Sequence, residues 1–112
     1  MIRAILAAVV LLSGCASYSE MQATEPLLEL TTSKTPDAYA GCVMPKAREL
    51  WRSMVTIAPD GQSQVISVAT NASTLSTTTI APRDDGSKVT FRAVSSMGVW
   101  GDEWPDDLRS CQ

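Results

Sequence analysis

Histidine is absent from this sequence of 112 residues. Its absence excludes Ser-His-Asp and Cys-His catalytic arrangements, zinc sites built on histidine, and the usual general base near neutral pH. Serine is plentiful, but neither the Gly-x-Ser-x-Gly nor the Ser-x-x-Lys motif that activates a serine occurs. We therefore predict that the protein is not an enzyme and has no cofactor.

The sequence also lacks a metal-binding pattern and a basic stripe. Its paired carboxylates are Asp84-Asp85, Asp102-Glu103 and Asp106-Asp107, and none has the alternating oxygen ligands, central glycine and distal glutamate of a calcium loop. We predict no metal and assign the first pair to a turn and the last to the start of a helix. Nine Lys and Arg residues against twelve Asp and Glu give a net charge of -3, so we predict no nucleic-acid partner.

Long apolar runs are lacking too, and the run that opens the chain, from Ala4 to Leu12, is short. Arg3 precedes it, and the small residues Ser13 and Gly14 follow it. This layout is typical of a secretory signal, whereas a membrane-spanning helix needs about 20 apolar residues. We predict a signal peptide over residues 1–14; the alternative is a buried N-terminal strand or helix.

The residues Leu12-Ser13-Gly14-Cys15 resemble the lipobox of bacterial lipoproteins. The resemblance implies that Cys15 carries a diacylglyceryl group on its sulfur, becomes the first residue of the mature protein, and has an acylated amino terminus. Two or three acyl chains anchor a protein stably, whereas one holds it only marginally. Ala16 is not the aspartate that retains many such proteins at the inner membrane, so we expect the protein at the outer membrane, with its domain facing the periplasm. The alternative location is the inner membrane.

Residues 15–34 are polar and mixed, with no sustained period, and we predict a lipid-anchored tether there. Leu27, Leu28 and Leu30 suggest an alternative, in which this cluster docks on the domain.

Two cysteines remain beside Cys15, namely Cys42 and Cys111. In an exported protein an even remainder of two favours one disulfide, and the alternative is two separate buried thiols. Such a bond would close a loop of about 70 residues and contribute about 4 kcal/mol in the chain-entropy model.

Residues 35–112 form the predicted domain, of the α+β class. Thr35 suits an N-cap and Pro36 the first helical position, and apolar residues then recur at helical spacing, with Pro45 predicting a kink or two helical pieces. Four strands follow as an antiparallel meander, around residues 55–57, 65–70, 74–81 and 88–93. A short helix opened by Pro105 places Leu108 and Cys111 against the core. The predicted order is helix, four strands, helix.

The whole arrangement loosely resembles small proteobacterial lipoproteins of undescribed function. The matching residues are Cys15, Pro36, Asp37, Cys42 and Cys111. The resemblance implies no activity.

The glycine-flanked tail contains our candidate partner contact, made of Trp100, Asp102, Glu103 and Trp104. Tryptophan dominates binding hot spots, and the alternative is that both rings cover one end of the core. The Ser/Thr-rich strand 74–79 is expected to be a solvated sheet face; its alternative is an exposed edge that pairs with a partner strand.

These features favour an outer-membrane lipoprotein whose periplasmic domain acts by binding an envelope protein, as an accessory or structural component. The alternative function is an immunity, inhibitor or phage-exclusion lipoprotein that blocks a toxin or a lytic enzyme.

Overall fold

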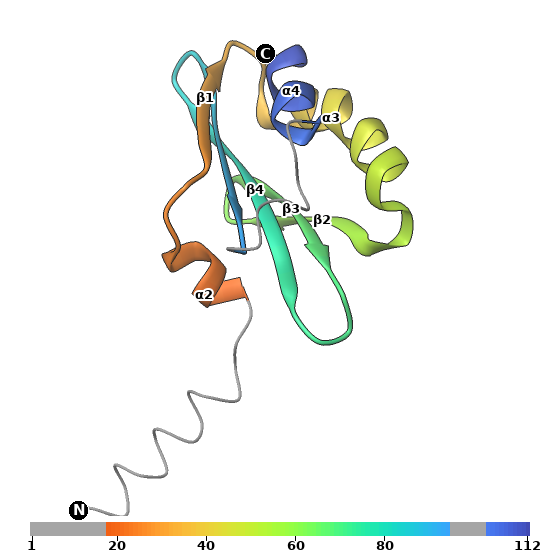
Figure 1. Ribbon diagram of the computed structural model, residues 1–112. Coiled ribbons are helices and arrows are strands. Elements are labelled where there is room, and N and C mark those ends of the chain that lie inside the picture. The colour runs from red at the N-terminus through yellow and green to blue at the C-terminus, as the bar shows by residue number, and fades with distance from the viewer. Residues whose placement is uncertain (1–17, 95–102) are drawn as a thin grey trace, which may run out of the picture.

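The computed structural model describes residues 18–94 and 103–112, which form a five-stranded sheet with helices on it (Figure 1). Cys15 lies outside the described residues, as do Trp100 and Asp102. In chain order the elements are α2 (Tyr18–Ala23), β1 (Leu28–Thr32), α3 (Pro36–Trp51), η1 (Arg52–Met54), β2 (Val55–Asp60), β3 (Ser63–Ala69), β4 (Thr74–Arg83), β5 (Gly86–Ala93) and α4 (Glu103–Ser110). None of the helices in these two ranges is long and apolar enough to cross a bilayer.

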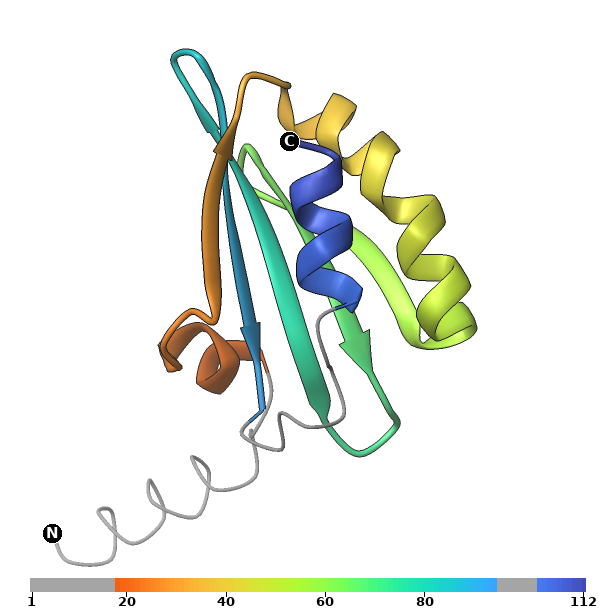
Figure 2. The same cartoon turned by 45° about the horizontal axis from the view of Figure 1, so that its top comes forward.

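The sheet has the order β1-β5-β4-β3-β2, and every neighbouring pair is antiparallel. The strands β2 to β5 form the predicted meander, which confirms the α+β class. Helices α3 and α4 lie side by side over one face of the sheet (Figure 2). The short helix α2 contacts β4 and β5, near the end of the sheet at which β1 begins.

The fifth strand, β1, together with α2 before it, corrects the predicted order of helix, four strands, helix. It pairs with β5 from Leu28, opposite Phe91, to Thr32, opposite Ser87. Leu28 and Leu30 pack against the core, as the docking alternative for the leucine cluster required. The folded domain therefore begins before residue 35, and residues 18–34 are not simply a tether.

Helix α3 begins as the sequence predicts, because Thr35 Oγ1 accepts a hydrogen bond from the Ala38 backbone N–H at 3.2 Å and Pro36 occupies the first turn. The helix continues through Pro45 to Trp51 as one element, so the prediction of two pieces is wrong. Pro45 and Gly41 both lie on the exposed side of the helix. Water can therefore hydrate the Gly41 carbonyl that Pro45 leaves without a donor.

Two of the hairpin turns depend on glycine. Pro59 lies within the edge strand β2, where a missing N–H is tolerated, and Gly61 takes a positive φ of 61° in the turn itself. The hairpin of β4 and β5 turns at Asp84-Asp85 and closes on Gly86, whose φ is 143°. A Cβ on Gly86 would lie 2.0 Å from the Thr32 carbonyl oxygen, so only glycine lets the end of β1 approach this closely.

The core fills the space between the sheet and the helices α3 and α4. Its largest fully buried side chains include Tyr39, Phe91, Trp104, Ile66, Ile80 and Leu108. Helix α4 begins at Glu103, two residues before the predicted start at Pro105. The predicted disulfide is confirmed: Cys42 of α3 is bonded to Cys111 just after α4, with their Cα atoms 5.8 Å apart.

Candidate functional site

Trp104 belongs to the core, which corrects its assignment to an exposed contact patch. Its side chain is only 1% exposed, and its indole N–H donates a hydrogen bond to Thr78 Oγ1 at 3.0 Å. The Trp51 ring meets it edge-on, with ring centroids 5.1 Å apart and planes at 71°, a favourable aromatic geometry. Trp104 therefore fixes α4 on the sheet and is not available to a partner.

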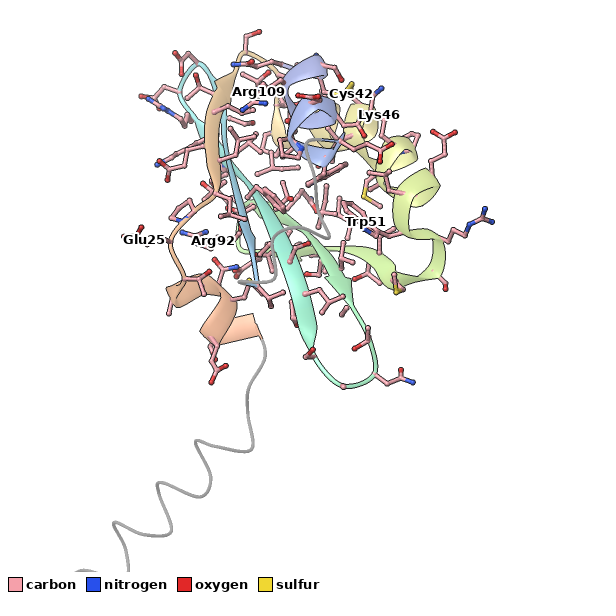
Figure 3. The ribbon with its side chains drawn as sticks, in the orientation of Figure 1. Glu25, Cys42, Lys46, Trp51, Arg92 and Arg109 are labelled. Carbon is pink, nitrogen blue, oxygen red and sulfur yellow. A yellow bond between two sulfur atoms is a disulfide. The ribbon has the colours of Figure 1, made fainter. Side chains whose placement is uncertain are left out.

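Glu103 is exposed at the first position of α4 and lines a pocket between α4 and α3. Asp107, one turn later, lies on the same wall, because residues four apart share a helix face. Lys46, Glu49 and Leu50 of α3 form the opposite wall, and the pocket holds about 380 Å³. We call this feature the interhelix pocket. Figure 3 labels Lys46 on α3 and Arg109 farther along α4.

Three carboxylates and one ammonium group line the interhelix pocket. Such a lining favours a positively charged group of a partner, such as a lysine or arginine side chain. Within residues 18–94 and 103–112 no three acidic or cysteine side chains are arranged to hold a metal ion. The arrangement can therefore attract a cation through charge and hydrogen bonds, and Leu50 adds one apolar surface.

The walls of the pocket are held in place by contacts behind it. The Cys42–Cys111 disulfide joins α3 to the residue after α4, and the buried Tyr39 hydroxyl donates to the Leu108 carbonyl oxygen at 2.7 Å. Burial raises the pKa of Tyr39, so this hydroxyl keeps its proton and stays a donor. Both links set the spacing between the two helices.

The C-terminal residues are clamped by polar groups of β1 and the segment after it. Thr32 Oγ1 donates to the Gln112 carbonyl oxygen at 2.8 Å, and the Gln112 side-chain amide donates to the Thr31 carbonyl at 2.9 Å. Lys34 Nζ donates to the carbonyl of Cys111. A smaller pocket of about 200 Å³ lies nearby, lined by Thr31, Thr32, Ser33, Arg83 and Asp85. These bonds assign the C-terminal residues a structural role.

The Ser/Thr-rich strand is in the middle of the sheet and not at its edge. β4 pairs with β3 on one side and with β5 on the other, so the alternative in which it pairs with a partner strand is wrong. The outermost strands of the described sheet are β1 and β2. A shallow pocket of about 320 Å³ lies over β2 and β3, lined by Ala58, Pro59, Asp60, Val65 and Ser67.

Of the four residues predicted for partner contact, only Glu103 is described and exposed. Sequence reasoning missed Lys46 and Glu49 and assigned Asp107 to the helix dipole. The signal available was their helical spacing, three apart in α3 and four apart for Glu103 and Asp107 in α4. That spacing does not show which faces of α3 and α4 lie opposite each other.

Comparison with protein-family models, with curated proteins and with solved structures finds no match to this chain.

Proposed function

We propose that the protein is an outer-membrane lipoprotein, anchored through Cys15, whose periplasmic domain acts by binding an envelope protein rather than by catalysis. The observation that carries the proposal is the Leu12-Ser13-Gly14-Cys15 tetrad directly after a short apolar run. The Cys42–Cys111 disulfide supports it, because structural disulfides persist in oxidising compartments such as the periplasm.

The interhelix pocket is the proposed contact site for the partner. Glu49, Glu103 and Asp107 give it an excess of negative charge over Lys46, and such an excess steers basic groups toward it. The disulfide behind it keeps its walls at fixed separation, so little ordering entropy is lost on binding.

The anchor is tested by mass spectrometry of the N-terminal peptide from membrane-extracted protein. We expect a peptide that begins at a lipid-modified Cys15, and we expect Cys15→Ser to leave the membrane fraction. An unmodified peptide that begins at Met1, recovered from a soluble fraction, would contradict both the anchor and the location.

The contact site is tested by crosslinking in cells, with a photoreactive residue in place of Glu103. The matched control replaces Gln62, which is exposed in the turn between β2 and β3. We expect a discrete crosslinked envelope protein from position 103, reduced by Glu49→Gln with Asp107→Asn, and none from position 62. Equal labelling from both positions would remove the pocket as the contact site, and a crosslinked toxin or lytic enzyme would support the inhibitor function instead.

A further inference from the structure

The segment that follows the proposed anchor is attached firmly to the domain. Met21 of α2 is 4% exposed, and the Gln22 side-chain amide donates to Thr77 Oγ1 at 3.3 Å. The Arg92 guanidinium donates from Nε to the Thr24 carbonyl at 3.1 Å and from a terminal nitrogen to Gln22 Oε1 at 3.4 Å. These contacts fix α2 against one end of β4 and β5.

Only a short stretch of chain separates α2 from Cys15. Helix α2 begins at Tyr18, and three residues span at most about 10 Å even when fully extended. A tether over the whole of residues 15–34 would have reached about 65 Å. If Cys15 is lipidated, the end of the domain that carries α2 is therefore held next to the lipid headgroups.

The strand directions show which other groups lie at this end. β1 begins there after Leu27, β2 begins there after Met54, and β3 joins β4 there through the loop of residues 70–73. Figure 2 shows α2, the start of β2 and this loop at the lower end of the molecule. We call this end the anchor end.

The anchor end exposes apolar side chains. Leu27 is 45% exposed and Met54 is 41% exposed, and they are the two large hydrophobic side chains that stand out as exposed in the described part of the chain. They flank the anchor end at opposite edges of the sheet, because β1 and β2 are the outermost strands. Apolar side chains placed in this way can enter the boundary between headgroups and acyl chains.

The charges of the two ends differ in the direction that a membrane contact requires. At the anchor end the exposed carboxylates of Glu20 and Glu25 are balanced by exposed Arg52 and half-buried Arg92. The opposite end carries the adjacent exposed carboxylates of Asp84 and Asp85 in the turn between β4 and β5, which together exceed the charge of the exposed Arg83 before them. The ten residues of β4 separate the two ends by about 30 Å, so the acidic turn is kept away from anionic lipids.

We propose that the anchor end docks on the bilayer surface, with Leu27 and Met54 in the interface and the Asp84-Asp85 turn directed away from it. The inference rests on the proposed lipidation of Cys15, and the partner it names is the lipid surface itself. The interhelix pocket then lies on the side of an upright domain, so its partner approaches parallel to the membrane.

The test uses the full lipidated chain in vesicles of phosphatidylethanolamine and phosphatidylglycerol that contain a nitroxide-labelled lipid. A fluorophore is attached at Ala72→Cys, in the anchor-end loop, or at Asp85→Cys, in the opposite turn. The introduced thiol is the reactive one, since Cys42 and Cys111 are bonded to each other. The two ends lie about 30 Å apart, whereas the headgroup layer of one leaflet is only about 5–8 Å deep. We therefore expect quenching about threefold stronger at position 72 than at position 85.

A lengthened chain separates docking from simple proximity. Inserting about twelve Gly and Ser residues between Ser17 and Tyr18 adds a flexible linker of about 20 Å. We expect the difference in quenching to survive this insertion and to disappear when Leu27→Ser and Met54→Ser are added. The matched control Gln62→Ser, at the opposite end, should leave it unchanged.

Equal quenching at positions 72 and 85 in the chain of natural length would overturn the inference, because the domain would then lie flat or tumble. Loss of the difference on lengthening alone would also overturn it, because the tether and not the surface would account for the proximity. Failure of the proposed function is detected separately, from the mass of the N-terminal peptide. If that peptide carries a lipid-modified Cys15 in either of these outcomes, the docking inference fails while the proposed anchor stands.

Discussion

The two faces of the sheet are made by alternate residues of the same strands, but they have different surroundings. Three consecutive threonines in β4 show the difference. Thr78 faces α4 and accepts the Trp104 indole N–H, whereas Thr77 faces the other way and accepts from Gln22 of α2. Thr79 lies on the same face as Thr77, and its buried Oγ1 finds no hydrogen-bond partner among the described residues. One residue type therefore has three energetic roles, decided by what packs over it.

The face under α3 and α4 also carries the apolar residues of the core, such as Ile80 and Phe91. The other face carries Thr90 and the exposed pair Lys88 and Glu29. Alternation along a strand predicts that two faces differ, but the depth of burial depends on the helices. Five predictions test this comparison, from the largest expected effect to the smallest.

Removing the central side chain of the face under α3 and α4 should have the largest effect on stability. Trp104→Ala removes a fully buried ring and should lower the free energy of unfolding by about 3–5 kcal/mol. Denaturant unfolding followed by circular dichroism measures the change. Arg92→Ala, on the other face, is the control and should cost less than about 1 kcal/mol. Similar losses for the two variants would contradict the assignment of the core to one face.

Breaking the link between α3 and α4 should come next. The double variant Cys42→Ser with Cys111→Ser opens a loop with a sequence separation of 69 residues and should cost about 3 kcal/mol, somewhat below the chain-entropy value of about 4 kcal/mol. The measurement compares its unfolding midpoint with that of the oxidised natural chain. Reduced natural protein is the matched control, and a midpoint equal to that of the oxidised form would contradict the prediction.

Two adjacent, identical substitutions should change stability in opposite directions. Thr78→Val leaves the buried Trp104 N–H without its acceptor and should cost about 1–3 kcal/mol. Thr79→Val removes a buried hydroxyl that lacks a described partner and should stabilise the fold by about 1 kcal/mol. Both variants gain the same strand propensity, so the difference between their unfolding free energies isolates the hydrogen bond. A change of the same sign in both would refute this account of the two faces.

Alkaline pH should lower the free energy of unfolding through the ionisation of Tyr39. Burial raises the pKa of Tyr39 in the folded state, while an unfolded tyrosine has a pKa of about 10. Above about pH 10 the unfolded chain loses this proton first, so unfolding becomes more favourable as the pH rises. Tyr39→Phe should cost about 1 kcal/mol at pH 7 and should show a smaller fall in stability between pH 9 and 11 than the natural protein. An unchanged slope would contradict the assignment.

The exposed ion pair on the face of the sheet opposite α3 and α4 should affect the free energy of unfolding least. Lys88 Nζ lies 3.6 Å from Glu29 Oε1, and both side chains are about half exposed. Glu29→Gln should change the free energy of unfolding by less than about 0.5 kcal/mol, because exposed pairs are screened by water and salt. The same measurement in about 1 M salt should give no difference between variant and natural protein. A loss above about 1 kcal/mol would show that this face is more structured than its exposure indicates.

Much of the fold could be predicted because it is encoded by short-range patterns. Thr35 and Pro36 start α3 through hydrogen bonds and φ restrictions within one turn, and glycine-containing turns set two of the three hairpins of the meander. The pairing of Cys42 with Cys111 is confirmed, and the reasoning needed only the number of cysteines that remain beside Cys15.

The candidate site was less predictable because burial is a property of the packed molecule. Trp104 in a glycine-flanked tail fits an exposed hot spot as well as a core residue, and only the position of α4 over Thr78 distinguishes the two. Of the residues proposed for contact, Glu103 alone is described as exposed, and the opposite wall of its pocket comes from α3, more than 50 positions earlier.

By itself, the sequence determined the α+β class, the start of the first long helix, the four-stranded meander and the single possible disulfide, because each depends on neighbours in the chain or on a simple count. Only the tertiary structure decided that Leu28–Thr32 becomes a fifth strand, that Trp104 is buried, and that Glu103 faces Glu49. These features depend on contacts between residues about 25 to 65 positions apart. Their free energy comes from burial and pairing in the assembled fold, which no local pattern contains.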